Sequence, residues 1–128
     1  MQRFSELKVW RRSHTLVLEL YRRTESFPRE ERYGLTAQLR RAGVSVPSNI
    51  AEGSKRRGNQ DYARFLNIAE ASLAETEYLI LLAHDLRYIA TAAAEPLLAE
   101  VSEISRMLLA LRFKVERGQS HRPFPVDC

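Results

Sequence analysis

The residues of this sequence best suited to binding chemistry are its arginines and lysines, which are concentrated in the first half. Residues 1–59 contain 13 Lys and Arg residues against 6 Asp and Glu residues, whereas residues 60–128 contain 7 against 10. The two halves therefore carry net charges of +7 and −3, and the whole chain carries +4. A basic surface of this kind attracts anionic partners, nucleic acid among them.

Two groups of these basic residues have a spacing that suits phosphate binding. On a helix, five side chains between Lys8 and Arg23 fall within a sector of roughly 120°, which Glu19 interrupts. Three consecutive basic residues lie in a connector between Gly53 and Gly58. Arginine provides delocalised charge and fork-like donors for phosphate oxygens. The predicted nucleic-acid-binding residues are Lys8, Arg11, Arg12, Arg22, Arg23, Lys55, Arg56 and Arg57.

Few aromatic residues accompany these cations, so we expect nonspecific binding of RNA or DNA rather than recognition of particular bases. The side chains are expected to be exposed and free of ion pairs with neighbouring carboxylates. The alternative is a solvated basic face that four glutamates partly neutralise: Glu6, Glu19, Glu25 and Glu52.

Sequence patterns of catalytic or metal-binding sites are missing. The chain has no phosphate loop of the G-x-x-x-x-G-K type, no dinucleotide fingerprint and no H-E-x-x-H. A di-iron bundle needs Glu three residues before His, but Arg11, Leu81 and Gly118 occupy those positions. Glu70 and Glu77 share a helix face, where solvation or pairing with arginine is expected. We therefore expect a protein without enzymatic activity, cofactor or metal.

Helices must position these residues, because a period of 3.6 dominates the chain and no stretch alternates with period 2. Ser5 is the predicted N-cap of the first helix, which ends before Pro28. The second pattern starts near residues 30–33 and ends at Gly53, predicted to be a left-handed terminator. Asn59 is the predicted N-cap of the third helix.

Two prolines constrain the second and fourth helices. Pro47 removes a backbone hydrogen bond and predicts a kink or an interruption, with Ser48, Asn49 and Glu52 satisfying the freed groups. A ligand or subunit contact is the alternative role of this polar segment. The fourth helix is expected to begin no earlier than about Ala92, because Pro96 is tolerated in a first turn. Gly118 is expected to end it.

Four amphipathic helices with short connectors predict an all-α, antiparallel up-and-down four-helix bundle. The length suits one domain, so we expect the bundle over residues 1–118 and a flexible tail over 119–128. The apolar stripes of the first and third helices are wider than one seam requires. This favours burial against other subunits over a fully occupied monomer core. His14 lies on such a stripe and is expected to be a core or interface histidine.

The composition is that of an ordinary globular protein, with 45% hydrophobic and 28% charged residues. No apolar run approaches the roughly 20 residues that a bilayer span needs. The N-terminal segment lacks the apolar block of a signal peptide. The single cysteine, Cys128, cannot form an intramolecular disulfide. We expect a cytoplasmic protein with no membrane contact.

Three stretches resemble a known family: FSELKVW (4–10), FPREERYGLTAQLRRAGVSVPSNIAEGSKR (27–56) and RFLNIAEASLAETEYLILLA (64–83). They resemble bacterial four-helix-bundle proteins encoded in intervening sequences of 23S rRNA genes. That family also looks related to the accessory variability protein of diversity-generating retroelements. The resemblance implies a homopentameric barrel, and most members have no assigned activity.

The retroelement relatives are basic and engage nucleic acid and a reverse transcriptase, so the resemblance implies those partners. Together these patterns predict a non-enzymatic homo-oligomer that binds RNA or DNA nonspecifically. The alternative is a protein-interaction scaffold without nucleic-acid contact.

Overall fold

The amphipathic segments form four long helices in a computed structural model that describes residues 3–118. A short 3-10 helix precedes each of the first two α-helices. In chain order the elements are η1 (Arg3–Glu6), α1 (Lys8–Thr24), η2 (Arg29–Glu31), α2 (Leu35–Ser54), α3 (Asn59–Asp85) and α4 (Thr91–Glu116).

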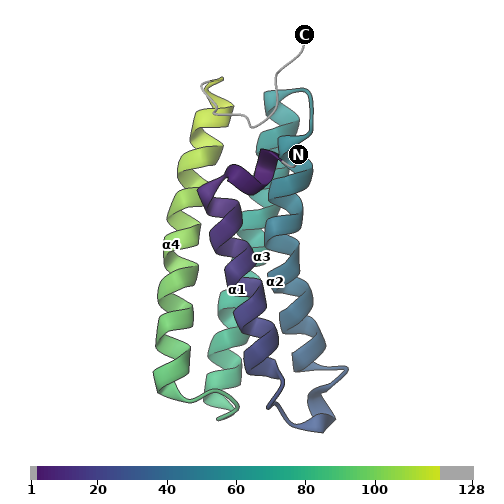
Figure 1. Ribbon diagram of the computed structural model, residues 1–128, viewed down its shortest axis with the longest axis vertical. Helices are drawn as coiled ribbons and strands as arrows, with labels where there is room; N and C mark the ends of the chain where they lie inside the picture. The colour runs from purple at the N-terminus through teal and green to yellow at the C-terminus, as the bar shows by residue number, and fades with distance from the viewer. Residues whose placement is uncertain (1–2, 119–128) are drawn as a thin grey trace.

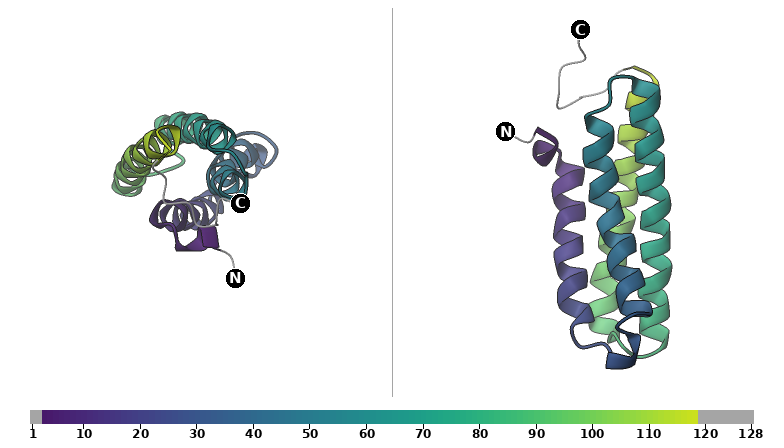
Figure 2. Two further views of the ribbon diagram at one scale, coloured as in Figure 1. Left: turned by 90° about the horizontal axis from the view of Figure 1, so that it is seen from above. Right: turned by 90° about the vertical axis from the view of Figure 1, so that its right-hand side faces the viewer.

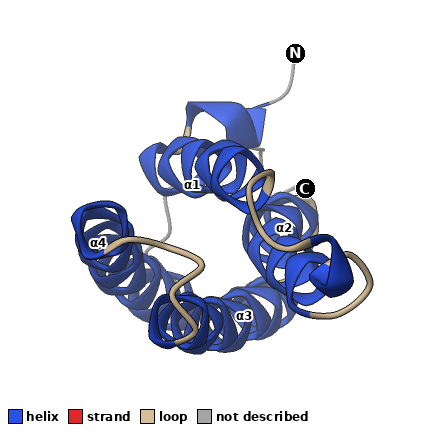
Figure 3. Cartoon of the chain, turned by 90° about the horizontal axis from the view of Figure 1, so that it is seen from below, coloured by secondary structure: helices blue, strands red, loops and turns tan. Residues whose placement is uncertain are grey.

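Successive helices run in opposite directions and pack side by side in a ring (Figures 1 and 2). Seen along the bundle, α1 lies between α2 and α4, and α3 lies opposite α1 (Figure 3). The predicted all-α four-helix bundle is confirmed. The connectors α1–α2 and α3–α4 lie at one end, and the α2–α3 connector lies at the other, close to the start of α1 (Figure 1).

The core consists of apolar side chains that recur at helical spacing on the inner face of every helix. Many of them are at most 3% exposed, and burial of one such side chain contributes about 1.5–3 kcal/mol. They include Leu16, Leu20, Leu39, Val46, Ile50, Leu66, Leu73, Ile80, Ile104 and Leu108. None of the helices within residues 3–118 combines the length and the apolar character that crossing a membrane requires.

Two predicted N-caps are wrong by one or two residues. The N-cap of α1 is Leu7, because Ser5 belongs to the 3-10 turn of η1. Phe4 of that turn packs edge-on against Trp10, with ring centroids 5.1 Å apart. The N-cap of α3 is Gly58, and Asn59 is already helical.

The two glycines expected to end helices behave differently. Gly118 has φ of 73° and follows the last turn of α4, as predicted. Gly53 instead lies buried within α2, which continues to Ser54. It is a site of close approach between helices, because a Cβ there would lie 2.7 Å from the Cβ of Phe65 in α3.

An interruption at Pro47 is wrong, because α2 is a continuous α-helix through this residue, and a kink within the continuous helix stays a prediction. Val46 and Ile50 on either side of the proline are 1% and 0% exposed. Their packing outweighs a cost of about 3 kcal/mol for an interior proline. Asn49 does bond to nearby backbone, since its Nδ2 donates to the backbone oxygen of Ser45 at 2.7 Å, but the carbonyl that Pro47 leaves without a donor is that of Gly43.

The fourth helix begins at Thr91, one residue earlier than expected, so Pro96 lies beyond its first turn. Pro96 and Ala92 are both exposed, so water can hydrate the carbonyl that the proline leaves without a donor. The tail predicted over residues 119–128 lies outside the described residues.

Candidate nucleic-acid interface

The structure brings five of the eight predicted cations to the same end of the bundle. This is the end where α1 begins and where α2 connects to α3 (Figure 1). All five side chains are exposed. We call this group the basic end, and it consists of Lys8, Arg11, Lys55, Arg56 and Arg57.

The short helix η1 joins the two parts of the basic end. Arg11 Nη1 donates to the backbone oxygens of Glu6 at 2.7 Å and of Ser5 at 3.3 Å. On the connector, Lys55 Nζ lies 5.6 Å from the centre of the Phe4 ring, within cation–π range. The start of α1 and the α2–α3 connector therefore both pack against η1. The sequence did not reveal Phe4 as a positioning residue, because its partner Lys55 lies 51 residues further along the chain.

Three of the five cations at the basic end form no close ion pair with a described carboxylate. Within residues 3–118, Lys8, Arg11 and Arg57 have no carboxylate oxygen within 4 Å of a side-chain nitrogen. Arg56 Nε lies 3.7 Å from Asp61 Oδ2, and its guanidinium lies over the Phe65 ring at 4.7 Å. Lys8, Arg11 and Arg57 are therefore the cations of the basic end whose charge no close carboxylate within residues 3–118 offsets.

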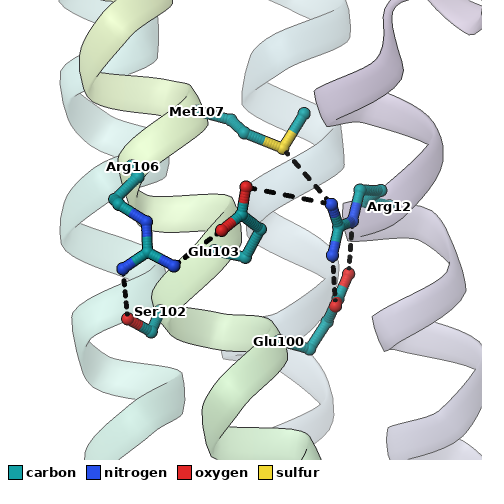
Figure 4. Close-up of polar contacts among 6 residues, drawn as sticks. All are labelled: Arg12, Glu100, Ser102, Glu103, Arg106 and Met107. Atoms are coloured by element: carbon teal, nitrogen blue, oxygen red, sulfur yellow. Dashed lines mark hydrogen bonds and ion pairs between the residues drawn. The ribbon is translucent and has the colours of Figure 1, made fainter.

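Arg12 is held by α4 and does not belong to the basic end. Its guanidinium forms two hydrogen bonds with Glu100, at 2.7 and 2.8 Å, and lies 4.0 Å from Glu103 (Figure 4). The hydrogen bond with Glu100 raises the pKa of Arg12. This pair joins α1 to α4 and makes Arg12 a structural contact between helices. Its partner was missed because it lies 88 residues further along the chain.

The expectation that the helix-one cations avoid Glu19 is wrong. Arg22 Nη2 and Arg23 Nε both donate to the Glu19 carboxylate, the latter at 2.9 Å. The cause is local, because side chains three and four residues apart are neighbours on a helix. Both arginines lie near the opposite end of α1 from the basic end, some 16 Å away at 1.5 Å per residue. Because Glu19 pairs with both of them, Arg22 and Arg23 attract phosphate less strongly than their positions on the basic face of the helix predict.

The ion pairs of two carboxylates, Glu19 and Glu103, should make the stability of the fold sensitive to acid. Hydrogen bonding from Arg22 lowers the pKa of Glu19, and Arg23 adds to the effect. Hydrogen bonding from Arg106 likewise lowers the pKa of Glu103 (Figure 4). A carboxyl group with a lowered pKa in the folded state stabilises the fold above its ordinary pKa of 4.5, and that stability is lost as pH falls further.

We therefore expect the free energy of unfolding, measured by urea titration, to fall as pH decreases through about 4.5. The double variant Glu19→Gln/Glu103→Gln should show a shallower fall. An equal pH dependence in the variant would contradict this assignment.

The Glu70 carboxylate pairs with Arg112 between α3 and α4, as expected for a carboxylate on this face. Arg112 Nη2 donates to Glu70 Oε1 at 3.3 Å and Nη1 donates to Glu116 Oε2 at 2.8 Å. The hydrogen bond with Glu70 raises the pKa of Arg112 above its ordinary value, and Glu116 adds to it. Across residues 3–118, no cluster of three His, Cys, Asp or Glu side chains is arranged to hold a metal ion.

His14 is not a core residue in the single chain. Its ring is exposed and stacks on Trp10, with centroids 5.0 Å apart and an interplanar angle of 11°. The two rings line an apolar groove between α1 and α2 that also includes Val17, Val44 and Pro47.

Further large apolar side chains are exposed on α1 and α3, the two helices whose apolar faces are wider than packing in one bundle requires. On α1, Leu18 is 57% exposed, and Tyr21 is also exposed. On α3, Tyr78 is 59% exposed, with Ile68 and Leu81 on the outer surface too. These residues are apolar surface that the monomer core does not use.

Comparisons with known proteins agree with this architecture. A crystal structure of a protein of unknown function from the S23 ribosomal protein family of Bacteroides thetaiotaomicron superposes with a TM-score of 0.73. It is 24% identical, and the match covers 81% of this chain and 97% of that one. No match was found among curated proteins. The family model described as 23S rRNA-intervening sequence protein matches residues 5–110, and the chain therefore belongs to this family.

Proposed function

We propose that this chain is a non-enzymatic, homo-oligomeric protein that binds RNA or DNA nonspecifically through its basic end. The observation that carries the proposal is the convergence of five exposed cations around η1, three of which have no nearby carboxylate within residues 3–118. Exposed, unpaired cations attract phosphates at long range and release counterions when they bind them. The description of the family refers to 23S rRNA, which makes RNA the first partner to test.

The basic end favours contacts with the phosphate backbone over recognition of bases. The rings nearest to its cations, Phe4 and Phe65, already lie under Lys55 and Arg56. They are therefore not free platforms on which bases can stack. We expect similar affinities for single strands of different sequence.

Fluorescence anisotropy with labelled RNA and DNA strands of mixed sequence tests the proposal. Saturable binding at low salt, with similar affinity for unrelated sequences, supports it. No binding at low salt would contradict it and would favour the alternative, a protein-interaction scaffold that uses the exposed apolar surface of α1 and α3.

We further propose that this apolar surface is buried between copies of the chain, a pentamer being the state that the resemblance implies. Light scattering coupled to gel filtration should then give a multiple of 14.8 kDa. The variant Leu18→Glu should lower the measured mass, because burial of a charge without a partner is costly. The matched variant Tyr33→Glu, at a side chain 85% exposed on the α1–α2 connector, should leave it unchanged. A stable wild-type monomer at micromolar concentration would contradict this prediction.

A further inference from the structure

A second group of arginines surrounds a recess at the opposite end of the bundle from the basic end. The segment that contains η2 connects α1 to α2 at this end (Figure 1), and the recess there has a volume of about 280 Å³. Its polar lining consists of three arginines, two threonines and one glutamate: Arg29, Arg32, Arg40, Thr24, Thr36 and Glu25. None of the eight cations predicted from the sequence lines it.

The three arginines keep their charge available to a ligand. In the described part of the chain, Arg29, Arg32 and Arg40 have no carboxylate oxygen within 4 Å. This differs from Arg12, Arg22 and Arg23, each of which has a carboxylate partner. With Glu25 included, the lining still carries a net charge of +2.

Arg40 is held in place by contacts that leave some of its donors free. Its Nε donates to Thr24 Oγ1 at 2.8 Å, and one Nη donates to the backbone oxygen of Tyr21 at 3.2 Å. The guanidinium also lies over the Tyr21 ring, 4.4 Å from its centre. A guanidinium has five N–H donors, so those not used here remain for a ligand. Such preorganisation lowers the entropy cost of binding.

Thr36 adds a neutral hydrogen-bond donor to the arginines of the recess. The residue is only 9% exposed, it lines the recess, and its hydroxyl has no hydrogen-bond partner within residues 3–118. The hydroxyl oxygen is not itself fully buried, so it is accessible to an acceptor that enters the recess. At the N-terminus of α2 the backbone N–H of Leu35 already donates to Glu31 Oε1 at 3.0 Å, so the arginines and the Thr36 hydroxyl are the donors left for a ligand.

We propose that this recess binds a phosphate group, which Arg29, Arg32 and Arg40 neutralise while the Thr36 hydroxyl donates to one of its oxygens. The recess is slightly smaller than pockets for drug-sized ligands, which start near about 300 Å³, and it suits a compact anion. Forked arginine donors match phosphate oxygens in geometry as well as in charge. The phosphate is either a free ion or the terminal group of a nucleic acid, and the two are separated experimentally.

The first experiment uses inorganic phosphate as the probe. The amide resonance of Thr36 in the isotope-labelled full-length protein is followed by NMR during titration with phosphate, against chloride at matched ionic strength. We expect a saturable shift with phosphate only. The double variant Arg29→Gln/Arg32→Gln changes two exposed side chains and should weaken the affinity at least about tenfold. The variant Thr36→Val removes only the hydroxyl and should weaken it less.

The control is the double variant Arg41→Gln/Arg106→Gln, which removes the same charge from exposed arginines outside the recess. It should bind phosphate like the wild type. An equal loss of affinity in this control, or no difference between phosphate and chloride in the wild type, would overturn the proposal.

The second experiment compares a short oligonucleotide carrying a 5′-phosphate with the same strand carrying a 5′-hydroxyl. A higher affinity for the phosphorylated strand, lost in Arg29→Gln/Arg32→Gln, identifies the ligand as a nucleic-acid terminus. Equal affinities, together with the saturable NMR shift, identify it as a free phosphate ion. Binding through the basic end is measured with the 5′-hydroxyl strand alone, so failure of one proposal is distinguishable from failure of the other.

Discussion

Replacing Lys55, Arg56 and Arg57 together by glutamine is expected to weaken binding to single-stranded RNA by about 10²-fold at 0.1 M salt. Each phosphate contact contributes a counterion-release slope of about 0.7–0.9, so three lost contacts remove roughly 2–3 units of slope. The three side chains are exposed on a connector, and glutamine keeps most of their length and polarity. The fold should therefore persist, which circular dichroism verifies.

The matched control for this variant is Arg41→Gln/Arg87→Gln/Arg106→Gln. It removes the same charge from exposed arginines on α2, the α3–α4 connector and α4. If binding depends on the basic end, this control should lose only the small affinity that the lower net charge accounts for. Equal losses in both triple variants would mean that binding depends on net charge alone, contrary to the proposed site.

Replacing Gly53 by alanine should destabilise the fold by about 1–3 kcal/mol, in spite of the higher helix propensity of alanine. The new Cβ would lie 2.7 Å from Phe65 Cβ and 3.3 Å from the backbone oxygen of Tyr62. These atoms are fixed to the backbone of α3, so the two helices must separate to accommodate the methyl group. Urea denaturation monitored by circular dichroism measures the change.

Gly43→Ala is the control for this effect of close packing. Gly43 also lies buried in α2, and among the described residues outside its own turn of helix the atom that its added Cβ would meet is Leu20 Cδ1, at 2.7 Å. That atom is the end of a flexible side chain, which can adjust its rotamer. We expect a change within about 1 kcal/mol, because the gain in helix propensity offsets this adjustment. A larger loss at Gly43 than at Gly53 would contradict the proposed contact between α2 and α3.

The fold was predictable because its signal is repeated along every helix. In α3 the apolar pattern from Tyr62 to Ala83 supplies several independent indications of one buried face. The end of a helix depends on a single capping residue, so the helix boundaries were predicted less accurately than the helices themselves. Ser5 and Asn59 are good N-cap residues, yet a 3-10 turn and the preceding glycine displaced the caps to Leu7 and Gly58.

The candidate sites were less predictable, because they depend on contacts between distant segments. Helical spacing placed Arg12 in the basic sector, but only the packing of α4 against α1 shows that Glu100 holds it. The pairing of Glu19 with Arg22 could have been predicted from the sequence, because residues three apart on a helix are neighbours. Arg29, Arg32 and Arg40 converge only after the α1–α2 connector folds, so no periodic pattern revealed the recess.

The salt dependence of RNA binding by the wild-type protein tests the central claim most directly. If all five cations of the basic end contact phosphates, log Kobs for a single strand should fall linearly with log salt concentration, with a slope of about −3.5. Strands of unrelated sequence should share this slope and nearly the same affinity. A slope near zero, or the absence of saturable binding at low salt, would contradict the assignment of the basic end as a nucleic-acid interface.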